Sequence, residues 1–361
     1  MTRVLVWQWG RRGGAPRFAA ALADALRALP GTEAVLSLSR RTELLRCMCA
    51  PACELPMETY GSALGFAGRL ATAPFALPAL VRRLRPLRLD VAVCALPGPL
   101  DLLMAAALRR LGVPFVVLVH DARAHEGDGL PLQLPLQRAL CRRAAGLVAL
   151  TGYVARQLQA DHRVGPADRP FLVSRHPPMA FDPPPPPPFR HGGRLRLLSF
   201  GRLLKYKGLE LLAETLRLLG PAPYAEVRLV GGGPETPALA ALRALPGVSV
   251  ENRWVPEEEI GTLLGWADAL VLSYTDATQS GVAAAALGAG RRVVATRVGG
   301  LADQLHDTSL ATLCRPDPLE LAAALRGLAA APSPPNAPVD TAAEWREMAG
   351  GLMRWIETEI R

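Results

Sequence analysis

Residues Leu270–Leu301 read LVLSYTDATQSGVAAAALGAGRRVVATRVGGL. This stretch predicts a strand, a polar loop, a short helix, a second strand and a glycine turn. Its apolar opening suits a buried parallel strand, and Ala283–Leu287 is a run of helix formers closed by glycines. We therefore expect a helix that begins near Gln279 or Ser280.

The start of that helix is a predicted anion site. Its first amides, those of Ser280, Gly281 and Val282, have no partner within the helix, and the helix dipole makes this end partly positive. Gly281 lacks a Cβ atom, so a diphosphate could approach its backbone closely. An ordinary turn capped by the side chain of Thr278 or Ser280 explains the same residues, and both interpretations stay open at this point.

Composition narrows the class of protein. The length of 361 residues suggests two α/β domains. Half of the residues are hydrophobic, which suggests a soluble globular protein with well-filled cores. The net charge of +9 and the pI near 9.8 favour an anionic partner, without choosing among nucleotide, lipid surface and nucleic acid. Aromatic residues make up only 5% and are not interleaved with a basic stripe, which argues against nucleic-acid binding.

The sequence predicts a cytoplasmic protein. Its N-terminus runs directly into a strand-like segment and lacks the pattern of a signal peptide. The most membrane-like stretch, residues 63–81, is interrupted by Arg69, Pro74 and Pro78, so we do not expect it to span a bilayer.

Six cysteines without a compact framework fit a reducing compartment. Cys47, Cys49 and Cys53 lie close together, but without a second ligand pair they are a weak zinc signal, and free thiols are the better interpretation.

A basic segment overlaps the membrane-like stretch. Residues 64–89 mix leucine, alanine and phenylalanine with five arginines: Arg69, Arg82, Arg83, Arg85 and Arg88. This composition suits the surface of an anionic membrane. A solvated basic helix explains it equally well.

The N-terminal half opens with a strand at Val4–Trp7 and a turn that contains Gly10, Gly13 and Gly14. Such glycines lie where a ligand meets the carboxyl ends of strands in a doubly wound sheet. Arginines after the second predicted strand, at residues 40–41, could hold the 2′-phosphate of NADP. The turn spells G-x-x-G-G and not G-x-G-x-x-G, so an NADP-dependent oxidoreductase is the weaker alternative.

Polar residues follow the predicted strand Phe115–Val119. His120 and Asp121 come directly after it, and His125 and Glu126 follow in the same loop. Active-site loops of α/β sheets lie at such strand ends. Two histidines and two acids within seven positions favour a functional role over a solvated loop.

The C-terminal half follows the run Pro183–Pro188, which predicts an extended polyproline II linker. A strand then leads into GRLLKYKG, residues 201–208, where Arg202 offers a planar fork and Lys207 a compact ammonium for a diphosphate. A further strand ends in the glycine turn at residues 231–234. The sequence G-x-x-x-x-G-K-[ST] is absent, which excludes a P-loop NTPase.

These motifs carry a resemblance. The segment over about residues 195–335 resembles the donor half of family 4 glycosyltransferases. Its motifs occur in the same order as in that family: GRLLKYKGLELL, then VGGGP, then ADALVLSYTDATQSG…GAGRRVVATRVGGLADQL. The N-terminal half is similar in outline only, through its glycine turn and His120-Asp121. The resemblance implies the GT-B fold, an α/β architecture of two Rossmann-like, doubly wound domains that face each other across a cleft.

The resemblance also implies a domain organisation: an acceptor domain over residues 1–178, a proline-rich linker over 179–194, a nucleotide-sugar donor domain over 195–335, and a tail over 336–361 whose helix crosses back to the first domain. One apolar face of the helix predicted at 344–360 suits that contact.

The implied function is retaining, metal-independent transfer of a hexose, without a cofactor, from a nucleoside diphosphate sugar to a glycan or lipid-linked acceptor, in cell-surface polysaccharide biosynthesis at the cytoplasmic face of the membrane. His120 would reach across to the donor sugar, and Arg202 and Lys207 would neutralise the leaving diphosphate. The expected donor-binding residues lie in glycine turns and at the helix start: Gly13, Gly14, Gly201, Gly232, Gly233, Gln279, Ser280, Gly281 and Val282.

The chain departs from the family pattern at two positions. Many members carry two glutamates eight positions apart across the helix start, and this sequence has Ala277 and Ala285 there. We expect Gln279 and Ser280 to contact phosphate or sugar instead, because both can donate as well as accept, and we expect relaxed selectivity for the donor sugar. A degenerate GT-B protein that binds a nucleotide or a partner without turnover is the alternative.

Overall fold

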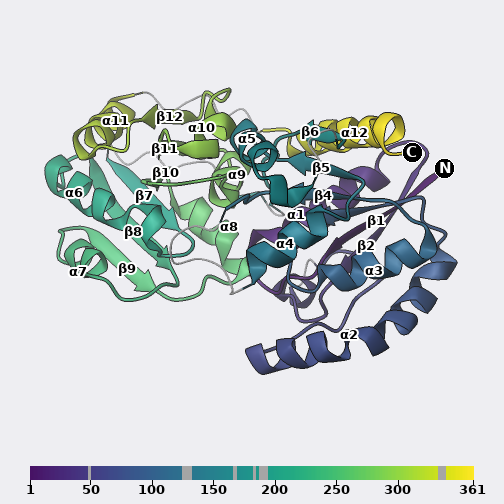
Figure 1. Ribbon diagram of the computed structural model, residues 1–361. Helices are drawn as coiled ribbons and strands as arrows, with labels where there is room; N and C mark the ends of the chain where they lie inside the picture. The colour runs from purple at the N-terminus through teal and green to yellow at the C-terminus, as the bar shows by residue number, and fades with distance from the viewer. Residues whose placement is uncertain (48–49, 124–131, 166–168, 182–183, 187–193, 332–338) are drawn as a thin grey trace. The chain divides into compact units, whose positions relative to one another are not determined.

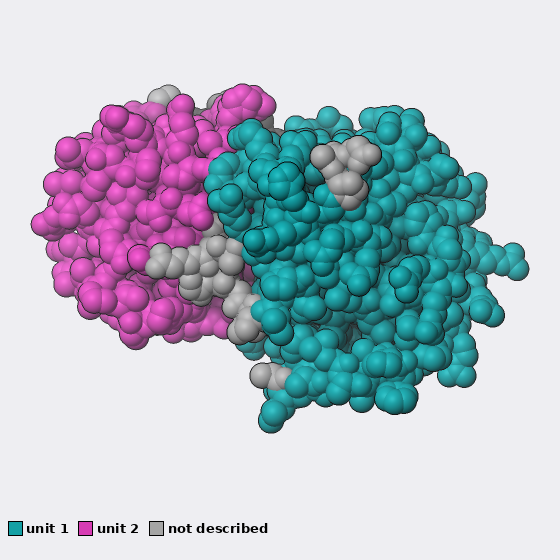
Figure 2. Space-filling model, viewed as in Figure 1, with its two compact units in different colours: residues 1–123, 130–175, 342–361 teal, residues 124–129, 176–341 magenta. Residues whose placement is uncertain are grey.

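The computed structural model describes residues 1–47, 50–123, 132–165, 169–181, 184–186, 194–331 and 339–361. The chain divides into two compact units, coloured separately in Figure 2. Of the described residues, unit 1 contains those within 1–123, 132–175 and 342–361, and unit 2 contains those within 176–341.

Unit 1 is built on a six-stranded parallel sheet in the order β2-β1-β3-β4-β5-β6. Its strands and helices alternate along the chain (Figure 1): β1 (Thr2–Gln8), α1 (Gly14–Arg27), β2 (Thr32–Leu38), η1 (Glu43–Arg46), α2 (Ala63–Leu84), η2 (Arg85–Leu87), β3 (Val91–Ala95), α3 (Asp101–Leu111), β4 (Phe115–Val119), α4 (Gln133–Cys141), β5 (Gly146–Ala149), α5 (Gly152–Ala160), η3 (His162–Val164) and β6 (Phe171–Val173). Every residue of β3, β4 and β5 is buried, which explains why these strands are continuously apolar.

The last helix, α12 (Thr341–Glu359), belongs to unit 1. Trp345 packs edge-on against Phe18 of α1, with ring centroids 5.1 Å apart. A Cβ atom on Gly146, at the start of β5, would overlap the indole ring of Trp355. The apolar face of α12 thus completes the core of the unit formed by the N-terminal residues.

Unit 2 repeats the architecture with a six-stranded parallel sheet in the order β12-β11-β10-β7-β8-β9. Its elements are β7 (Leu195–Phe200), η4 (Lys205–Lys207), α6 (Leu209–Leu219), β8 (Tyr224–Gly231), α7 (Pro237–Arg243), β9 (Val248–Asn252), α8 (Glu257–Trp266), β10 (Ala269–Leu272), α9 (Gly281–Gly288), β11 (Arg292–Thr296), α10 (Gly299–Leu305), β12 (Ala311–Cys314) and α11 (Pro318–Ala330). The predicted α/β class, with two doubly wound parallel sheets, is confirmed.

The two prolines that interrupt the membrane-like stretch do not interrupt helix α2. Pro74 and Pro78 both lie inside one continuous helix. Both are exposed, so the carbonyl groups that lose their intrahelical partners can bond to water. Among the described residues, one helical stretch, Leu64–Leu87, is long and apolar enough to cross a membrane by length and composition, and 6% of its most apolar window is buried.

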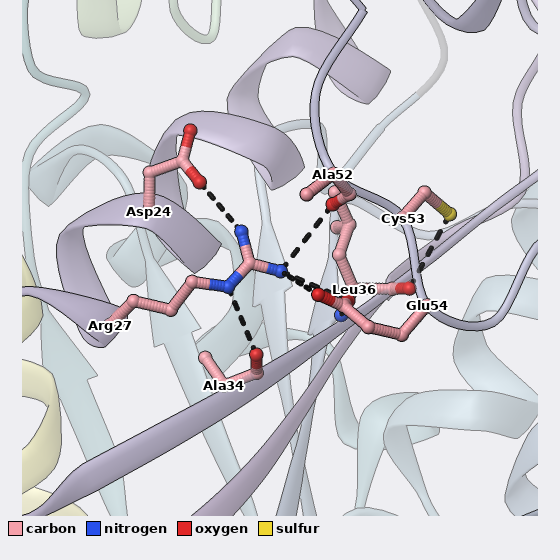
Figure 3. Close-up of polar contacts among 7 residues, drawn as sticks. All are labelled: Asp24, Arg27, Ala34, Leu36, Ala52, Cys53 and Glu54. Atoms are coloured by element: carbon pink, nitrogen blue, oxygen red, sulfur yellow. Dashed lines mark hydrogen bonds and ion pairs between the residues drawn. The ribbon is translucent and has the colours of Figure 1, made fainter.

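The loop after β2 is tied to unit 1 by Arg27 at the end of α1 (Figure 3). Its guanidinium donates to the carboxylate of Asp24 at 2.6 Å and to that of Glu54 at 3.0 Å. Glu54 also accepts the amide of Leu36 at 2.8 Å, and the Cys53 thiol lies 3.4 Å from the Leu36 carbonyl oxygen. These contacts fix the cysteine-containing loop along the edge of the sheet.

The cysteines of this loop give no metal-binding arrangement within the described residues, where no three histidine, cysteine or acidic side chains gather. Neither Cys47 nor Cys53 is in a disulfide bond, and burial raises the pKa of the Cys53 thiol. Cys49 lies outside the described residues.

The segment that leads into the proline run packs on unit 2. The amide of Met179 donates to the carbonyl oxygen of Ala284 in α9, at 2.9 Å. Gly288, one turn later, leaves room for the Met179 carbonyl group, which a Cβ atom at that position would overlap. This segment is therefore held against α9.

A buried arginine fixes the next part of the same segment. Arg291 is 1% exposed, and its guanidinium donates to the carbonyl oxygens of Leu264, at 2.6 Å, and of Pro186. Burial lowers the pKa of Arg291 to about 10, which still leaves it charged at neutral pH. The sequence predicts a spacer over residues 179–194, whereas the structure packs its described first part onto unit 2.

Candidate functional site

Three loops of unit 2 leave the carboxyl ends of adjacent strands. We name them the β7 loop (residues 201–208), the β8 loop (231–234) and the β10 loop (273–280). Because β10, β7 and β8 are neighbours in a parallel sheet, their loops emerge at the same edge. Ligands of doubly wound sheets bind at this edge.

Glycine allows the β7 and β8 loops to touch through their backbones. A Cβ atom on Gly231 would overlap the carbonyl oxygen of Gly201, and one on Gly233 would overlap that of Leu203. The Leu203 amide also donates to the Gly232 carbonyl oxygen at 3.0 Å. A Cβ atom on Gly232, by contrast, would meet nothing closer than 3.7 Å. Gly231 and Gly233 therefore shape the loops themselves.

A further glycine joins the β7 loop to the β10 loop. Gly208 adopts a φ of 68°, and a Cβ atom there would overlap the carbonyl oxygen of Ser273. The Ser273 hydroxyl donates to the carbonyl oxygen of Lys207 at 3.0 Å, and the Thr275 amide donates to that of Tyr206 at 2.9 Å. The three loops thus form one connected backbone structure, which we call the loop platform.

The two cations predicted to bind diphosphate share an aromatic support on the loop platform. Lys207 Nζ lies 3.7 Å from the ring centroid of Tyr274 and 4.8 Å from that of Tyr206. Arg202 Nη2 donates to the hydroxyl of Tyr206 at 3.2 Å. Burial raises the pKa of Tyr274 to about 12, so this ring stays neutral. Cation–π contacts of this kind hold an ammonium without neutralising its charge.

Ser280 caps helix α9, as one of the two sequence interpretations predicts. Its hydroxyl accepts the amide of Ala283 at 3.2 Å. Its own amide donates to Gln304 Oε1 at 2.8 Å, and Gln304 Nε2 donates back to its carbonyl oxygen at 3.0 Å. The Ser280 amide is therefore already bonded, and the first two amides of the helix proper are those of Gly281 and Val282.

Open space lies in front of this helix start. A Cβ atom on Gly281 would meet no atom within 4 Å. Gln279 Oε1 is buried and has no hydrogen-bond partner among the described residues. A methyl carbon of Val282 lies 3.3 Å from where a Cβ atom on Gly201 would be, which joins the helix start to the loop platform.

The two alanines that replace the family's glutamates are buried. Ala277 is 1% exposed and Ala285 is 6% exposed. The Ala277 carbonyl oxygen accepts the amide of Gly300 at 2.9 Å, which connects the β10 loop to α10. Small side chains at both positions are thus part of the core around α9.

The remaining predicted residues belong to unit 1. Gly13 caps α1 with a φ of 80°, and neither it nor Gly14 has an atom within 4 Å of an added Cβ atom. His120 follows β4, with Nε2 3.1 Å from Asp121 Oδ2 and its side chain 22% exposed. The structure therefore places Gly13, Gly14 and His120 in unit 1 and the other predicted residues in unit 2.

Two alternatives raised by the sequence also fall in unit 1. Arg40 and Arg41, the residues of the NADP interpretation, have Nε atoms 3.9 and 3.8 Å from the carboxylate oxygens of Glu58. His125 and Glu126 lie outside the described residues.

Sequence reasoning did not find three residues that organise the site: Tyr206, Tyr274 and Gln304. Tyr206 lies between the two lysines of the motif, so its position was visible but its role was not. Gln304 is 24 residues beyond Ser280, and no local pattern joins the two.

The glycine contacts lead to a prediction about stability. Gly231→Ala should destabilise the protein by about 3 kcal/mol or more, because its methyl group would overlap a backbone atom that cannot move without shifting the β7 loop. Gly232→Ala, the matched control, should stay within about 1 kcal/mol of the parent. Denaturant unfolding monitored by circular dichroism measures both, and equal effects would contradict the proposed backbone contact.

Comparisons with known proteins agree with this geometry. Residues 12–175 match the family model Glycosyltransferase Family 4, and residues 194–331 match the model Glycosyl transferases group 1. The 2-deoxystreptamine glucosyltransferase of Streptomyces kanamyceticus is 29% identical over 286 residues, which cover 71% of this chain and 72% of that protein.

Solved structures share the fold. Anabaena HepE in complex with UDP and glucose has a TM-score of 0.67 at 17% identity, covering 99% of this chain and 96% of that one. A glycosyltransferase from Rickettsia africae has a TM-score of 0.66 at 15% identity, covering 99% and 98%. Two glycosyltransferase family models match, one in each unit, and the curated relative is a glucosyltransferase. With the shared fold, these findings show that this chain is a glycosyltransferase of the GT-B fold.

Proposed function

We propose that the protein is a retaining, metal-independent hexosyltransferase that uses a nucleoside diphosphate sugar. The observation that carries the proposal is the loop platform, which gathers Arg202, Lys207 and the start of α9 at one edge of the unit 2 sheet. The acceptor is a glycan or a lipid-linked saccharide of cell-surface polysaccharide biosynthesis, at the cytoplasmic face of the membrane. The motif resemblance described above supports the retaining mechanism.

The charge of the platform suits a leaving diphosphate. Arg202 and Lys207 bring two positive charges, and the amides of Gly281 and Val282 add the partial positive charge of a helix start. In group transfer, negative charge develops on the diphosphate as the glycosidic bond breaks, so fixed positive groups stabilise the transition state more than the ground state. These groups stabilise the negative charge of the diphosphate, as a metal ion does in other nucleotide-dependent enzymes.

The sugar end of the donor is recognised without the paired carboxylates. Gln279 offers a buried amide oxygen. The motif resemblance supports a role for His120 in positioning the donor sugar and stabilising the transition state. With methyl groups at Ala277 and Ala285, no carboxylate from these positions selects sugar hydroxyls. The proposed enzyme therefore discriminates weakly among donor sugars.

The same two alanines favour the second candidate, a nucleotide-binding protein without turnover. Uridine nucleotides are the first ligands to test, because the similar HepE structure was solved with UDP and glucose. 2-Deoxystreptamine belongs in the acceptor panel because the curated relative is named for it. Binding of UDP without transfer to any acceptor would favour the second candidate.

Removal of either cation should weaken nucleotide binding and turnover together. Arg202→Ala and Lys207→Ala each remove a charge-assisted contact worth about 1.5–3 kcal/mol, or roughly tenfold to a hundredfold in UDP affinity by calorimetry. Lys205→Ala is the matched control, because it removes an equal charge from the same loop. Parental affinity in both cation variants would place the diphosphate elsewhere.

His120→Ala should keep UDP affinity and lower turnover by about tenfold or more.

Gly281→Ala should separate binding from folding. The added methyl group has open space and a permitted backbone conformation, so the melting temperature should stay at the parental value or rise slightly. The methyl group would occupy the space in which a diphosphate approaches the helix start, and UDP affinity should fall by about tenfold or more. Gly327→Ala in α11, which also meets nothing within 4 Å, is the control. Unchanged UDP affinity in Gly281→Ala would remove this helix start from the site.

Helix α2 supports the proposed membrane contact. Its outward face carries Leu64, 86% exposed, and Phe75, 83% exposed. Residues 59–89 contain five arginines and no acidic residue. Apolar side chains beside clustered arginines suit an anionic bilayer surface, where each basic residue contributes about 1 kcal/mol.

The full-length protein should co-sediment with vesicles that contain phosphatidylserine and not with vesicles of phosphatidylcholine alone. High salt should release it, because screening removes the attraction of the arginines. Phe75→Ser should weaken the association several-fold, roughly as expected for loss of one buried aromatic group, and Leu319→Ser, at a 65% exposed position of unit 2, should not. Equal binding to both vesicle types would contradict the membrane contact.

A further inference from the structure

A cavity of about 370 Å³ lies in unit 1 beside the inner side of α2. Its apolar lining includes Met57, Leu80, Leu100 and Leu103, together with Trp9. The volume falls in the range of pockets that bind small molecules. None of these residues belongs to the proposed nucleotide site in unit 2.

The cavity is also positively charged. Arg40, Arg69 and Arg83 contribute to its lining, with Glu58 as the one acidic lining residue. Arg69 donates to the carbonyl oxygen of Thr59 at 2.9 Å. Arg83 donates to the carbonyl oxygen of Pro56 at 3.3 Å and to the sulfur of Met57 at 3.1 Å. These hydrogen bonds go to uncharged groups, so they orient the two guanidiniums without neutralising them.

The place of the cavity in the sheet favours ligand binding. Trp9 follows β1, and Leu100 lies between β3 and α3. In the sheet order β2-β1-β3-β4, the chain goes from β1 to β2 in one direction and from β3 to β4 in the opposite direction, so the order reverses between β1 and β3. Open α/β sheets bind ligands outside the carboxyl ends of their strands at such a reversal point.

Two faces of α2 have different surroundings. Arg69, Ala76, Leu80 and Arg83 are spaced by seven, four and three residues, so they share the face that lines the cavity. Phe75 is 83% exposed and is not part of the lining. Changes to the cavity can therefore be made without altering the outward apolar face.

We propose that this cavity binds an anionic amphiphile, with its apolar chain against the leucines and its phosphate or carboxylate group at Arg69 and Arg83. This inference rests on the proposed function in one respect. It assumes that the amphiphile is the acceptor, so that the acceptor is lipid-linked and not a free glycan. An apolar wall alone would suit any hydrophobic molecule, and arginines alone would suit any anion. Their combination in one cavity selects a molecule with both parts.

The test is calorimetric titration of the full-length protein, without nucleotide, with dodecyl phosphate below its micelle concentration. Dodecyl maltoside and inorganic phosphate serve as probes with only the chain or only the anion. We expect saturable binding of dodecyl phosphate that is about tenfold or more tighter than that of either control probe. Equal binding of inorganic phosphate, or no binding of dodecyl phosphate, would overturn the proposal.

Three variants locate the binding. Ala76→Trp places a large side chain on the face of α2 that lines the cavity, at a half-buried position, and should abolish binding. Arg83→Gln should weaken binding by about tenfold. Arg82→Gln, which removes an equal charge from the adjacent position outside the lining, should stay within about twofold. Thermal unfolding checks that each variant is folded, and an equal loss in Arg82→Gln and Arg83→Gln would overturn the proposal.

A last measurement distinguishes an acceptor from an ordinary membrane lipid. If the cavity holds the acceptor's apolar chain, Ala76→Trp should leave co-sedimentation with phosphatidylserine vesicles unchanged. Reduced co-sedimentation would overturn the assignment to the acceptor. UDP affinity, measured on the same variants, reports on unit 2 alone, so failure of this inference is distinguishable from failure of the proposed function.

Discussion

The backbone contact between Gly231 and the carbonyl oxygen of Gly201 is the constraint on which the candidate site in unit 2 depends. It brings the β7 and β8 loops to a separation that no side chain permits, and the contact of Gly208 with Ser273 adds the β10 loop. Where the three backbones are joined, Lys207 lies beside the ring of Tyr274. The cations are thus held in place before a ligand arrives, and little reorganisation is needed during group transfer.

Unit 2 is also tied to the segment that precedes it. Arg291 is buried with its charge and donates to carbonyl oxygens, including that of Pro186. Removal of a charge from water is costly, so such an arginine requires these acceptors in place. The described start of the proline-rich segment, up to Pro186, is therefore a structural part of unit 2 that polar contacts hold in place.

The fold was largely readable from the sequence because parallel strands and amphipathic helices leave local patterns. The predicted strand Phe115–Val119 is β4, and the helix expected near Ser280 begins with Ser280 as its cap. Local rules are less informative where they compete with the surroundings of a residue. Pro74 and Pro78 break helices in general, yet water can satisfy the carbonyls that they free on an exposed face.

The site was predictable only as a set of motifs. A local pattern identifies Arg202 and Lys207 as paired cations, but the pairing of Ser280 with Gln304 joins residues from different elements and leaves no trace in either segment. The cavity beside α2 was equally hidden, because its lining comes from the residue after β1, the loop after β2, helix α2 and the start of α3. Sequence shows which residues a segment contains, and packing decides which segments meet.

The backbone contacts of the loop platform have a consequence for how such sequences change during evolution. Gly208, Gly231 and Gly233 leave no room for a Cβ atom, so the domain needs them for its backbone contacts whether or not it transfers a sugar. A descendant that lost catalysis would keep these glycines under purifying selection, while Arg202, Lys207 and Gly281 would be free to drift. Ancestry is therefore recorded in the glycine motifs, and the retention of activity is recorded in the few side chains and the one open backbone position that the fold does not need.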